Sequence, residues 1–402
     1  MISTVSRPYI DASVPVLKVH GLAITRHFYA SLFKAHPELQ NLFNMGNQAN
    51  GTQQQSLAAA VFAYAANIDN AAALAPVIER IVHKHASLGI TSSHYPIVGR
   101  HLLGAIQTVL GDAATPPLMA AWDEAYWLLA GELIAAEARL YQQAGVQAGE
   151  WMTVQVKAVQ QESDDVVSYT LQTPQGTSPG AFKPGQYISV VVQLGKLRQL
   201  RQYSLSDSPD KATWRISVKR EAVTNDTPAG QVSNWLHANI KAGDHLQISP
   251  AFGDFTPPLD LATPIVLISA GIGITPMVSI LNTLTQRHPT RPVVFIHAAR
   301  NGQHHALQGD LDAARAVHHR LRVVVCYESP LPTDTLGQTY HHAGRLDLAQ
   351  ALQEADMDGD FYLCGPIGFM QTQWQSLLAA KVHASRIHRE VFGPELLNLL
   401  PS

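Results

Sequence analysis

Residues 76–90 read PVIERIVHKHASLGI, and this stretch decides how the first third of the chain is interpreted. Its apolar residues recur every three or four positions, which predicts an amphipathic helix from Pro76 to Leu88. At about 100° per residue, His85 falls on the apolar face and His83 on the polar face. An inward histidine is either a core residue hydrogen-bonded to a carbonyl group or a ligand of a metal or haem. The stretch alone leaves both interpretations open.

A carboxylate elsewhere in the chain bears on that choice. In the last long helical stretch, Glu137 shares one stripe with the apolar residues Ala130, Leu133 and Leu140. A buried carboxylate requires a partner. A histidine that binds iron through one ring nitrogen needs an acceptor for its other N–H, and Glu137 can be that acceptor. The pair therefore favours a haem or metal ligand over a plain core histidine.

The sequence divides into three regions with different patterns of apolar residues. Residues 15–143 have helical periodicity and predict an all-helical domain. Residues 151–258 form short β-branched runs between Pro-Gly and Gly-Asp turns, which predict an antiparallel barrel or sandwich. From residue 263, fully apolar strands alternate with helices, as in an α/β domain whose parallel sheet is covered on both faces. The predicted domains of this multidomain chain are 1–147, 150–258 and 260–402.

Composition excludes several classes of protein. The chain has 402 residues with 46% apolar and 15% charged side chains, so it is neither disordered nor collagen-like. Lys and Arg total 28 against 31 Asp and Glu, without the basic excess of a nucleic-acid-binding protein. Two cysteines, Cys326 and Cys364, are too few for a disulfide framework. With no signal peptide and no integral membrane segment, a cytoplasmic protein is expected.

Three motifs in the middle of the chain predict a flavin site. A strand ends with an arginine that can pair with pyrophosphate and a tyrosine and serine that can reach the flavin ring, at Arg201, Gln202, Tyr203 and Ser204. A helix opens with N–H groups that suit a phosphate at Gly230, Gln231, Val232 and Ser233. Upstream stands Pro184-Gly185-Gln186-Tyr187. The order of the three elements makes a chance match improbable.

A glycine-rich turn predicts a nicotinamide site in the last third. A strand ending at Ser269 runs into a turn and then a helix, through Ala270, Gly271, Ile272, Gly273, Ile274 and Thr275. Glycines there permit close approach of a phosphate to a helix N-terminus. No Asp or Glu stands between Ile265 and Gly309, so the acidic ribose ligand typical of NAD sites is missing. Arg300 could meet a 2′-phosphate, and the choice between NADH and NADPH stays open.

Longer motifs carry a resemblance to a known family. Residues 1 to about 145 resemble the globin domain of bacterial and yeast flavohaemoglobins, through AHPELQNLF ending at Phe43, HKHASLGI at 83–90 and HYPIVGRHLL at 94–103. The remainder is similar to the ferredoxin-reductase superfamily, with an FAD-binding barrel and a nicotinamide-binding domain. Its matching motifs include Leu363–Pro366 and EVFGP at 390–394. One departure, at Ser249–Phe255, predicts a local change of turn without loss of FAD.

In the globin domain the resemblance implies a haem b site. The residues it assigns are His85 as proximal iron ligand, Tyr95 and Glu137 as a relay behind it, Tyr29, Gln53 and Leu57 over bound oxygen, Phe43 on the porphyrin, and Lys84 at the flavin-facing edge. A strongly donating proximal ligand and a tyrosine hydroxyl over the bound ligand favour chemistry over oxygen storage.

In the reductase the resemblance implies that Tyr187 flanks FAD. Phe392 is expected to shield the flavin and to move when nicotinamide arrives, while Glu390 tunes the potentials. The closing motif as a whole is Glu390, Val391, Phe392, Gly393 and Pro394. Haem b, FAD and NAD(P)H are thus the expected cofactors.

The implied activity is that of a nitric oxide dioxygenase, which converts NO and O2 to nitrate with electrons from NAD(P)H. One alternative is an oxygen- or NO-binding sensor whose reductase only resets ferric haem. Another is a lipid hydroperoxide reductase, because Leu57, Val61 and Leu102 make the distal space apolar. The expected partners are O2 and NO, with a lipid in the distal pocket as a further candidate, and the protein is expected to be a monomer that binds no nucleic acid.

Overall fold

A computed structural model describes residues 1–43, 46, 48, 50–223 and 229–393. Contacts between Cα atoms divide the chain into two compact units. The first contains Met1–Trp151 and Val191–Arg201, and the second contains Met152–Val190 and Gln202–Phe392. Among the described residues, no helix is both long and apolar enough to cross a bilayer.

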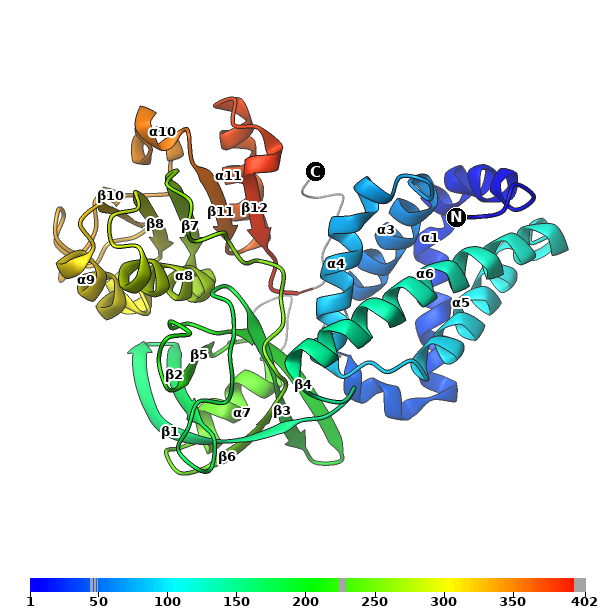
Figure 1. The fold of residues 1–402 in the computed structure, drawn as a ribbon, viewed down its shortest axis with the longest axis horizontal. Helices are drawn as coiled ribbons and strands as arrows, with labels where there is room; N and C mark the ends of the chain where they lie inside the picture. Colours follow the sequence, from blue (N-terminus) through cyan, green and yellow to red (C-terminus); the bar gives the residue numbers. More distant parts are fainter. Residues whose placement is uncertain (44–45, 47, 49, 224–228, 394–402) are drawn as a thin grey trace. The chain divides into compact units, whose positions relative to one another are not determined.

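The first unit is helical (Figure 1). Its elements are α1 (Arg7–Ala35), η1 (Pro37–Leu42), α3 (Thr52–Ala66), α4 (Ala71–Leu88), α5 (His94–Leu110), η2 (Gly111–Ala113) and α6 (Pro116–Ala144). Prolines in the first turns of α1 and α6 cost no hydrogen bond. Gly89 and Gly145 end α4 and α6 in the left-handed conformation that glycine adopts without strain. The predicted all-helical domain is confirmed.

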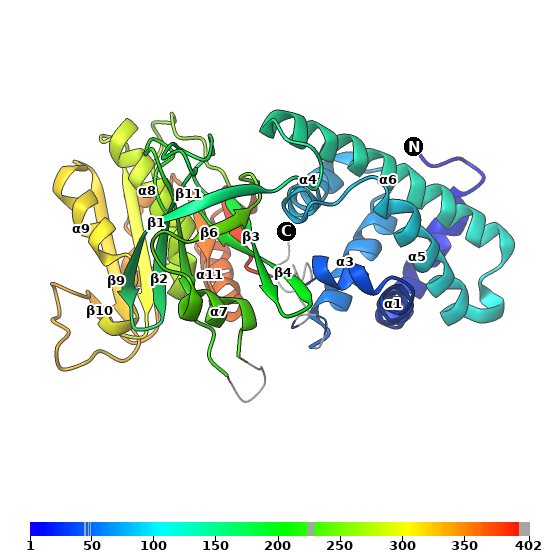
Figure 2. The same ribbon diagram turned by 90° about the horizontal axis from the view of Figure 1, so that it is seen from below.

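Helix α4 begins earlier than the sequence predicts. Pro76 was expected at its start, but the helix starts at Ala71 and contains Pro76. Asn70 caps it, because the Asn70 side chain accepts a hydrogen bond from the backbone N–H of Ala73 at 3.1 Å. An asparagine cap followed by three alanines therefore outweighs the proline as a start signal. Helices α4 and α6 pack side by side (Figure 2).

A six-stranded antiparallel sheet follows the helices along the chain. Its strands are β1 (Met152–Ser163), β2 (Val166–Gln172), β3 (Tyr187–Leu194), β4 (Leu197–Ser204), β5 (Trp214–Lys219) and β6 (His245–Ile248), in the order β4-β3-β6-β1-β2-β5. A bridge from Leu205 to Ile216 links the chain after β4 to β5, so the two edges of the sheet approach as in a barrel. Helix α7 (Gln231–Asn239) lies between β5 and β6 in sequence.

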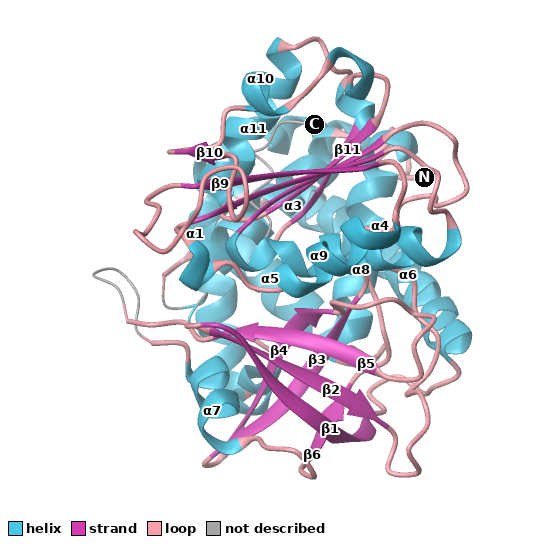
Figure 3. Ribbon diagram, turned by 90° about the vertical axis from the view of Figure 1, so that its left-hand side faces the viewer, coloured by secondary structure: helices cyan, strands magenta, loops and turns pink. Residues whose placement is uncertain are grey.

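A parallel sheet follows, in the order β10-β9-β8-β7-β11-β12. Its strands are β7 (Ile265–Ala270), β8 (Val293–Ala299), β9 (Leu321–Tyr327), β10 (His342–Ala343), β11 (Asp360–Cys364) and β12 (Ile387–Glu390). The main helices are α8 (Ile274–Arg287), α9 (Gln308–Val317), α10 (Leu348–Ala351) and α11 (Ile367–Ala379), and short 3-10 turns are η3 (Gly271–Gly273), η4 (Gly302–His304), η5 (Glu354–Asp356) and η6 (Ala384–Arg386). Helices α8 and α9 cover one face and α10 and α11 the other (Figure 3), which confirms the predicted α/β architecture.

A buried polar network joins the antiparallel sheet to the helices of the parallel sheet. Arg215 on β5 forms a bidentate ion pair with Asp310 on α9, at 2.8 and 3.1 Å. Asn282 on α8 donates to Asp310 at 2.8 Å and to Asp207 at 2.9 Å. Burial acts to raise the pKa of Asp207, but Arg215 and Lys211 hold that pKa below its ordinary value. These paired charges and hydrogen bonds therefore connect β5 and Asp207 to α8 and α9 within the second unit.

Two buried histidines lie in the core of the parallel-sheet domain. The rings of His297 on β8 and His305 stack with centroids 4.8 Å apart. His297 Nδ1 contacts Ser269 Oγ and His305 Nδ1 contacts Tyr327 OH, both at 2.9 Å. Neither Nε2 atom has a hydrogen-bond partner among the described residues. Burial lowers the pKa of His305 to about 4, so the pair is neutral at pH 7.

This pair should make the protein acid-sensitive. The pKa of His305 rises from about 4 in the folded chain to the ordinary 6.5 on unfolding, so only the unfolded state takes up a proton between those values. Stability present above pH 6.5 should therefore fall by about 3 kcal/mol as the pH drops to about 4. Urea unfolding of the full chain at several pH values, with hydrogen exchange of β8 and β9 amides, measures the loss. The variant His305→Asn should lose less over this range, whereas the exposed control His319→Asn should follow the wild type. Equal slopes for all three proteins would contradict the assignment.

Candidate functional site

His85 is held by a buried carboxylate and a buried tyrosine. Its Nδ1 lies 2.8 Å from Glu137 Oε1 and 3.2 Å from the hydroxyl of Tyr95, and that hydroxyl donates to the same Glu137 oxygen at 2.5 Å. Glu137 is only 3% exposed. Because the carboxylate accepts from Nδ1–H, the lone pair of the ring resides on Nε2. The structure brings together the three residues that the sequence predicted for the proximal side.

Three helices position this group. Tyr126 on α6 donates to the backbone carbonyl of Tyr95 on α5 at 2.6 Å. A Cβ at Gly99 would lie 2.5 Å from the Tyr126 ring, so glycine permits this approach of α5 to α6. Burial, followed by the bond to Glu137, raises the pKa of Tyr95 far above its ordinary value. Tyr95 therefore stays protonated and serves Glu137 as a donor.

Phe43, Gln53 and Leu57, which were predicted for the haem site, lie around Tyr29 on α1. The Tyr29 ring packs against Phe43 and Phe33, with centroids 5.6 and 5.8 Å away. Burial raises the pKa of Tyr29 well above its ordinary value, and hydrogen bonding from the side chains of Gln53 and Gln48 opposes that rise. Gln48 was not predicted. It lies in a segment without periodicity, so no sequence pattern singled it out.

The residues present fit a haem. The imidazole of His85 offers one nitrogen ligand, which is the donor set that haem iron takes from a globin. Leu57 and Val61 on α3 and Phe43 are only half-buried although they are apolar, and they belong to the same core cluster as Tyr29. Such surfaces suit the flat apolar faces of a porphyrin. Lys84 precedes His85 on α4 and is also half-buried.

The predicted flavin motifs lie at the end of β4 and at the start of α7. Arg201, Gln202, Tyr203 and Ser204 end β4, and Gly230, Gln231, Val232 and Ser233 open α7, as predicted. The hydroxyl of Ser204 is buried without a partner in the described part of the chain, which fits a ligand with polar atoms. Tyr187 begins β3 and exchanges two backbone hydrogen bonds with Phe252, at 2.8 and 2.9 Å.

Gly185 explains why a glycine precedes Tyr187. Its φ of +97° lies in the left-handed region, and a Cβ there would stand 1.9 Å from the carbonyl oxygen of Phe255. The departure that the sequence showed at Ser249–Phe255 is thus the segment packed against this glycine. An isolated bridge between Tyr187 and Phe252 pairs this segment with the start of β3.

The nicotinamide motif lies where β7 meets α8. Gly271 has φ +53°, and a Cβ at Gly273 would lie 2.4 Å from the carbonyl oxygen of Cys364. These glycines let the turn after β7 pass close to the end of β11. Cys364 itself is fully buried in the core, and burial raises the pKa of its thiol well above the ordinary value. It is therefore a core residue rather than a nucleophile.

The closing motif begins at the last residue of strand β12. Glu390 ends β12, Val391 and Gly393 follow with Phe392, which is 48% exposed, while Pro394 lies outside the described residues.

The nearest part of the chain to the end of β8 carries an acidic residue outside the interval 265–309, and its carboxylate lies 3.5 Å from Arg345 Nε. Glu328 follows β9, its backbone N–H donates to the Ala299 carbonyl at 3.0 Å, and Ser329 N–H donates to the carbonyl of Arg300 at 2.8 Å. An acidic and a basic residue thus lie together at the ends of β8 and β9.

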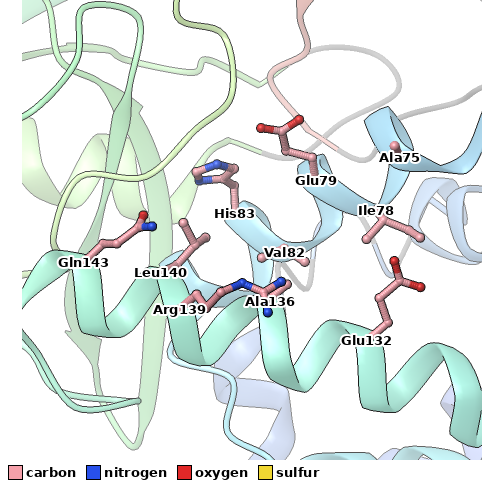
Figure 4. A pocket seen from close by; sticks show the side chains of 10 residues that line it. All are labelled: Ala75, Ile78, Glu79, Val82, His83, Glu132, Ala136, Arg139, Leu140 and Gln143. Carbon is pink, nitrogen blue, oxygen red and sulfur yellow. The ribbon is translucent and has the colours of Figure 1, made fainter. Parts of the chain in front are cut away.

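A groove of about 280 Å³ lies on the outer face of α4 and α6 (Figure 4). Ile78, Val82 and Leu140 form an apolar floor, and Glu79, His83, Glu132 and Arg139 stand around it. His85 and Glu137 do not line the groove, so it is separate from the proximal group. His83 lines this groove and His85 does not.

Three families match successive parts of the chain. Globin matches residues 26–133, the Oxidoreductase FAD-binding domain 153–256, and the Oxidoreductase NAD-binding domain 267–375. Each match lies inside one of the three predicted domains, whose exact boundaries remain a prediction.

Full-length relatives decide the family. The chain is 46% identical to a flavohemoprotein of Rhizobium meliloti over 98% of this chain and 99% of that protein. It is 48% identical to a flavohemoprotein of Chromobacterium violaceum, with 98% of each chain covered. The chain belongs to the flavohemoprotein family. The cofactors of this flavohemoprotein are accordingly haem, FAD and a nicotinamide dinucleotide.

Solved structures agree with this assignment. A flavohemoglobin from Malassezia yamatoensis with bound FAD and haem superposes with a TM-score of 0.85 at 30% identity, covering 98% of this chain and all of that one. The FAD/NAD-binding domain of a nitric oxide dioxygenase from Vibrio cholerae is 38% identical over 60% of this chain, with a TM-score of 0.55. The flavohemoprotein is thus a globin joined to an oxidoreductase.

Replacing the charge behind His85 should weaken its donation to iron. Glu137→Gln keeps an acceptor oxygen but removes the charge, so the iron–histidine stretching frequency in resonance Raman spectra of the ferrous protein should fall. Activity should drop about 10–100-fold. Glu132→Gln, an exposed site on the same helix, is the matched control and should change neither quantity. An unchanged frequency in Glu137→Gln would argue against its role.

Gly185→Ala should damage the flavin domain. A left-handed φ and a backbone obstacle together should lower the free energy of unfolding by about 3 kcal/mol and reduce the FAD content of the purified protein. Gly195→Ala isolates the conformational part, because Gly195 has φ +60° but open space around it, and should cost about 1 kcal/mol. Urea unfolding followed by FAD fluorescence compares them, and equal losses would contradict the steric argument.

Proposed function

We propose that this flavohemoprotein is a nitric oxide dioxygenase. Each NO and O2 pair takes one electron and forms nitrate, and each NAD(P)H supplies two electrons and releases NAD(P)⁺ and a proton. The observation that carries the proposal is the contact of His85 with the buried Glu137 and Tyr95. The Vibrio cholerae neighbour is described as part of a nitric oxide dioxygenase, and its similarity supports the proposal.

Glu137 sets the electronic character of His85. When bound, haem supplies the iron at which the gases react, and FAD divides the two-electron reductant into single electrons. A carboxylate that accepts the Nδ1–H bond makes the imidazole a stronger electron donor than a neutral carbonyl would. Tyr95 holds the carboxylate in place by donating to the same oxygen, at 2.5 Å. This arrangement suits redox chemistry better than reversible storage.

Tyr29 and Gln53 are proposed to act on the ligand side. Burial keeps the Tyr29 hydroxyl protonated at neutral pH, because its pKa is raised. Its proton can therefore be donated to negative charge that develops on the ligand. Gln53 bonds to the same hydroxyl and orients it, while Leu57, one helical turn further along α3, adds an apolar wall that excludes water.

The reductase residues are proposed to bind and order the dinucleotides. Arg201 pairs with the FAD pyrophosphate, the N-terminus of α7 meets a phosphate, and Tyr187 flanks the ring system. The turn at Gly271–Gly273 receives the nicotinamide dinucleotide. Lys84 lies at the haem edge, and Phe392 and Glu390 lie beside the flavin. NADH and NADPH are both admitted, since Glu328 favours a free ribose and Arg300 favours a 2′-phosphate.

Other features bear on the alternatives. The lipid hydroperoxide reductase stays an alternative, which rests on the apolar side chains of Leu57, Val61 and Leu102 in the core of the helical unit. Cys326 and Cys364 are both buried as free thiols, which supports a reducing compartment such as the cytoplasm. We also propose that the protein carries out this reaction as a monomer.

Turnover separates the dioxygenase from a sensor. Purified protein should show haem and flavin bands, and added NO under air should accelerate NADH oxidation in proportion to nitrate formed. In a sensor, the NADH consumed would not be proportional to the NO destroyed. Nitrate formation that is absent despite stoichiometric haem and FAD would overturn the proposal.

Tyr29→Phe removes the proposed donor. Oxygen should dissociate about 10–100-fold faster from the reduced protein, as expected for loss of a hydrogen bond to a charged group, and NO turnover should fall. Flash photolysis or rapid mixing with CO measures the dissociation rate. Tyr9→Phe, on the same helix but exposed, should match the wild type. An unchanged oxygen off-rate in Tyr29→Phe would reject this role.

A further inference from the structure

Gln48 is a glutamine beside Tyr29 to which the mechanism above assigns no task. Its side-chain Oε1 accepts a hydrogen bond from Gln54 Nε2 at 2.9 Å, and its backbone carbonyl accepts from the same nitrogen at 3.2 Å. Gln54 lies on α3, next to Gln53. The side-chain amide of Gln54 therefore donates two hydrogen bonds to Gln48.

This double contact defines the orientation of both amides. Gln54 Nε2 faces two oxygens and must be the donor, because an oxygen in its place would meet the Gln48 carbonyl oxygen at 3.2 Å. The atom of Gln48 that faces Gln54 must then be its oxygen. Its NH2 group is directed elsewhere by exclusion.

That NH2 group is buried. Gln48 Nε2 has no hydrogen-bond partner of ordinary length and angle among the described residues. Buried donors without a partner are rare and mark places where a contact forms under other conditions. The side chain of Gln48 interacts with the hydroxyl of Tyr29, as that of Gln53 does.

A tyrosine hydroxyl has one proton to donate and two lone pairs to accept with. When Gln53 and Gln48 both donate to the Tyr29 oxygen, the lone pairs are engaged and the proton must point outward. Hydrogen bonds received by an oxygen also strengthen the bond that its own proton makes. With both amides donating to its oxygen, the Tyr29 hydroxyl can act toward a further group only as a hydrogen-bond donor.

We propose that Gln48, gripped by Gln54, is a positioning residue that commits the Tyr29 hydroxyl to donating its proton to a small, negatively polarised ligand such as O2 or fluoride. The inference rests on the proposed placement of Tyr29 on the ligand side of the haem. It concerns ligand retention, so it is measured without NO turnover. The contact from Gln48 shortens when a ligand draws the Tyr29 proton outward.

The test uses the full-length holoprotein with variants on and off this chain of contacts. Gln48→Leu should speed oxygen dissociation about fivefold and weaken fluoride binding to the ferric protein by a similar factor. Gln54→Leu should change both in the same direction but less, because it only loosens Gln48. Gln55→Leu, at an exposed position of α3, is the matched control and should leave both unchanged. An unaltered Soret band shows that each variant retains haem.

A double-mutant cycle shows whether Gln48 acts through Tyr29. In the Tyr29→Phe background, Gln48→Leu should have no further effect on the oxygen off-rate or on fluoride affinity. Additive effects would overturn the proposal, because they mean that Gln48 contacts the ligand by itself, and so would a silent Gln48→Leu in the wild-type background. These outcomes are independent of nitrate formation, so failure of the dioxygenase proposal is recognised separately.

Discussion

The hydrogen bond from His85 Nδ1 to the buried carboxylate of Glu137 is the constraint on which the globin unit depends. A carboxylate that is 3% exposed is costly unless donors surround it, and His85 and Tyr95 supply those donors. Three helices must meet for this to happen. The close approach of α5 and α6 at Gly99 and the hydrogen bond from Tyr126 to the Tyr95 carbonyl serve that meeting. The same contact leaves the ring lone pair on His85 Nε2, the atom proposed to bind iron.

The reductase unit follows another constraint, the close approach of backbone to backbone. Gly185 and Gly273 stand where any Cβ would collide with a carbonyl oxygen of a neighbouring segment, at Phe255 and Cys364. Close approaches of this kind shape both dinucleotide motifs, because phosphates and rings are bound by main-chain groups at strand ends. The ion pair of Arg215 with Asp310 then braces the antiparallel sheet against α8 and α9. Main-chain geometry and buried charge thus both shape this unit.

Much of this was open to prediction because it is local. Helical periodicity placed His85 inward and His83 outward, and the motif Arg201–Ser204 was expected at the end of a strand, where β4 does end. Long apolar strands predicted a sheet covered on both faces. The predicted start of α4, at Pro76, was wrong by five residues. The helix begins at Ala71 because the Asn70 cap outweighs the proline as a start signal. Pairwise distances across the fold were beyond such reasoning, because periodicity describes a face and not what lies opposite it.

Sequence alone determined the three regions, the family resemblance and the inward face of His85, because periodicity, turn chemistry and motif spacing are properties of neighbouring residues. The tertiary structure alone decided that Tyr95 and His85 share one Glu137 oxygen, that Glu328 comes to lie beside Arg300, and that Gln54 grips Gln48. Each of those contacts depends on the direction in which a polar side chain finds its partner. That direction is set only when separate helices and strands pack and water is excluded from between them.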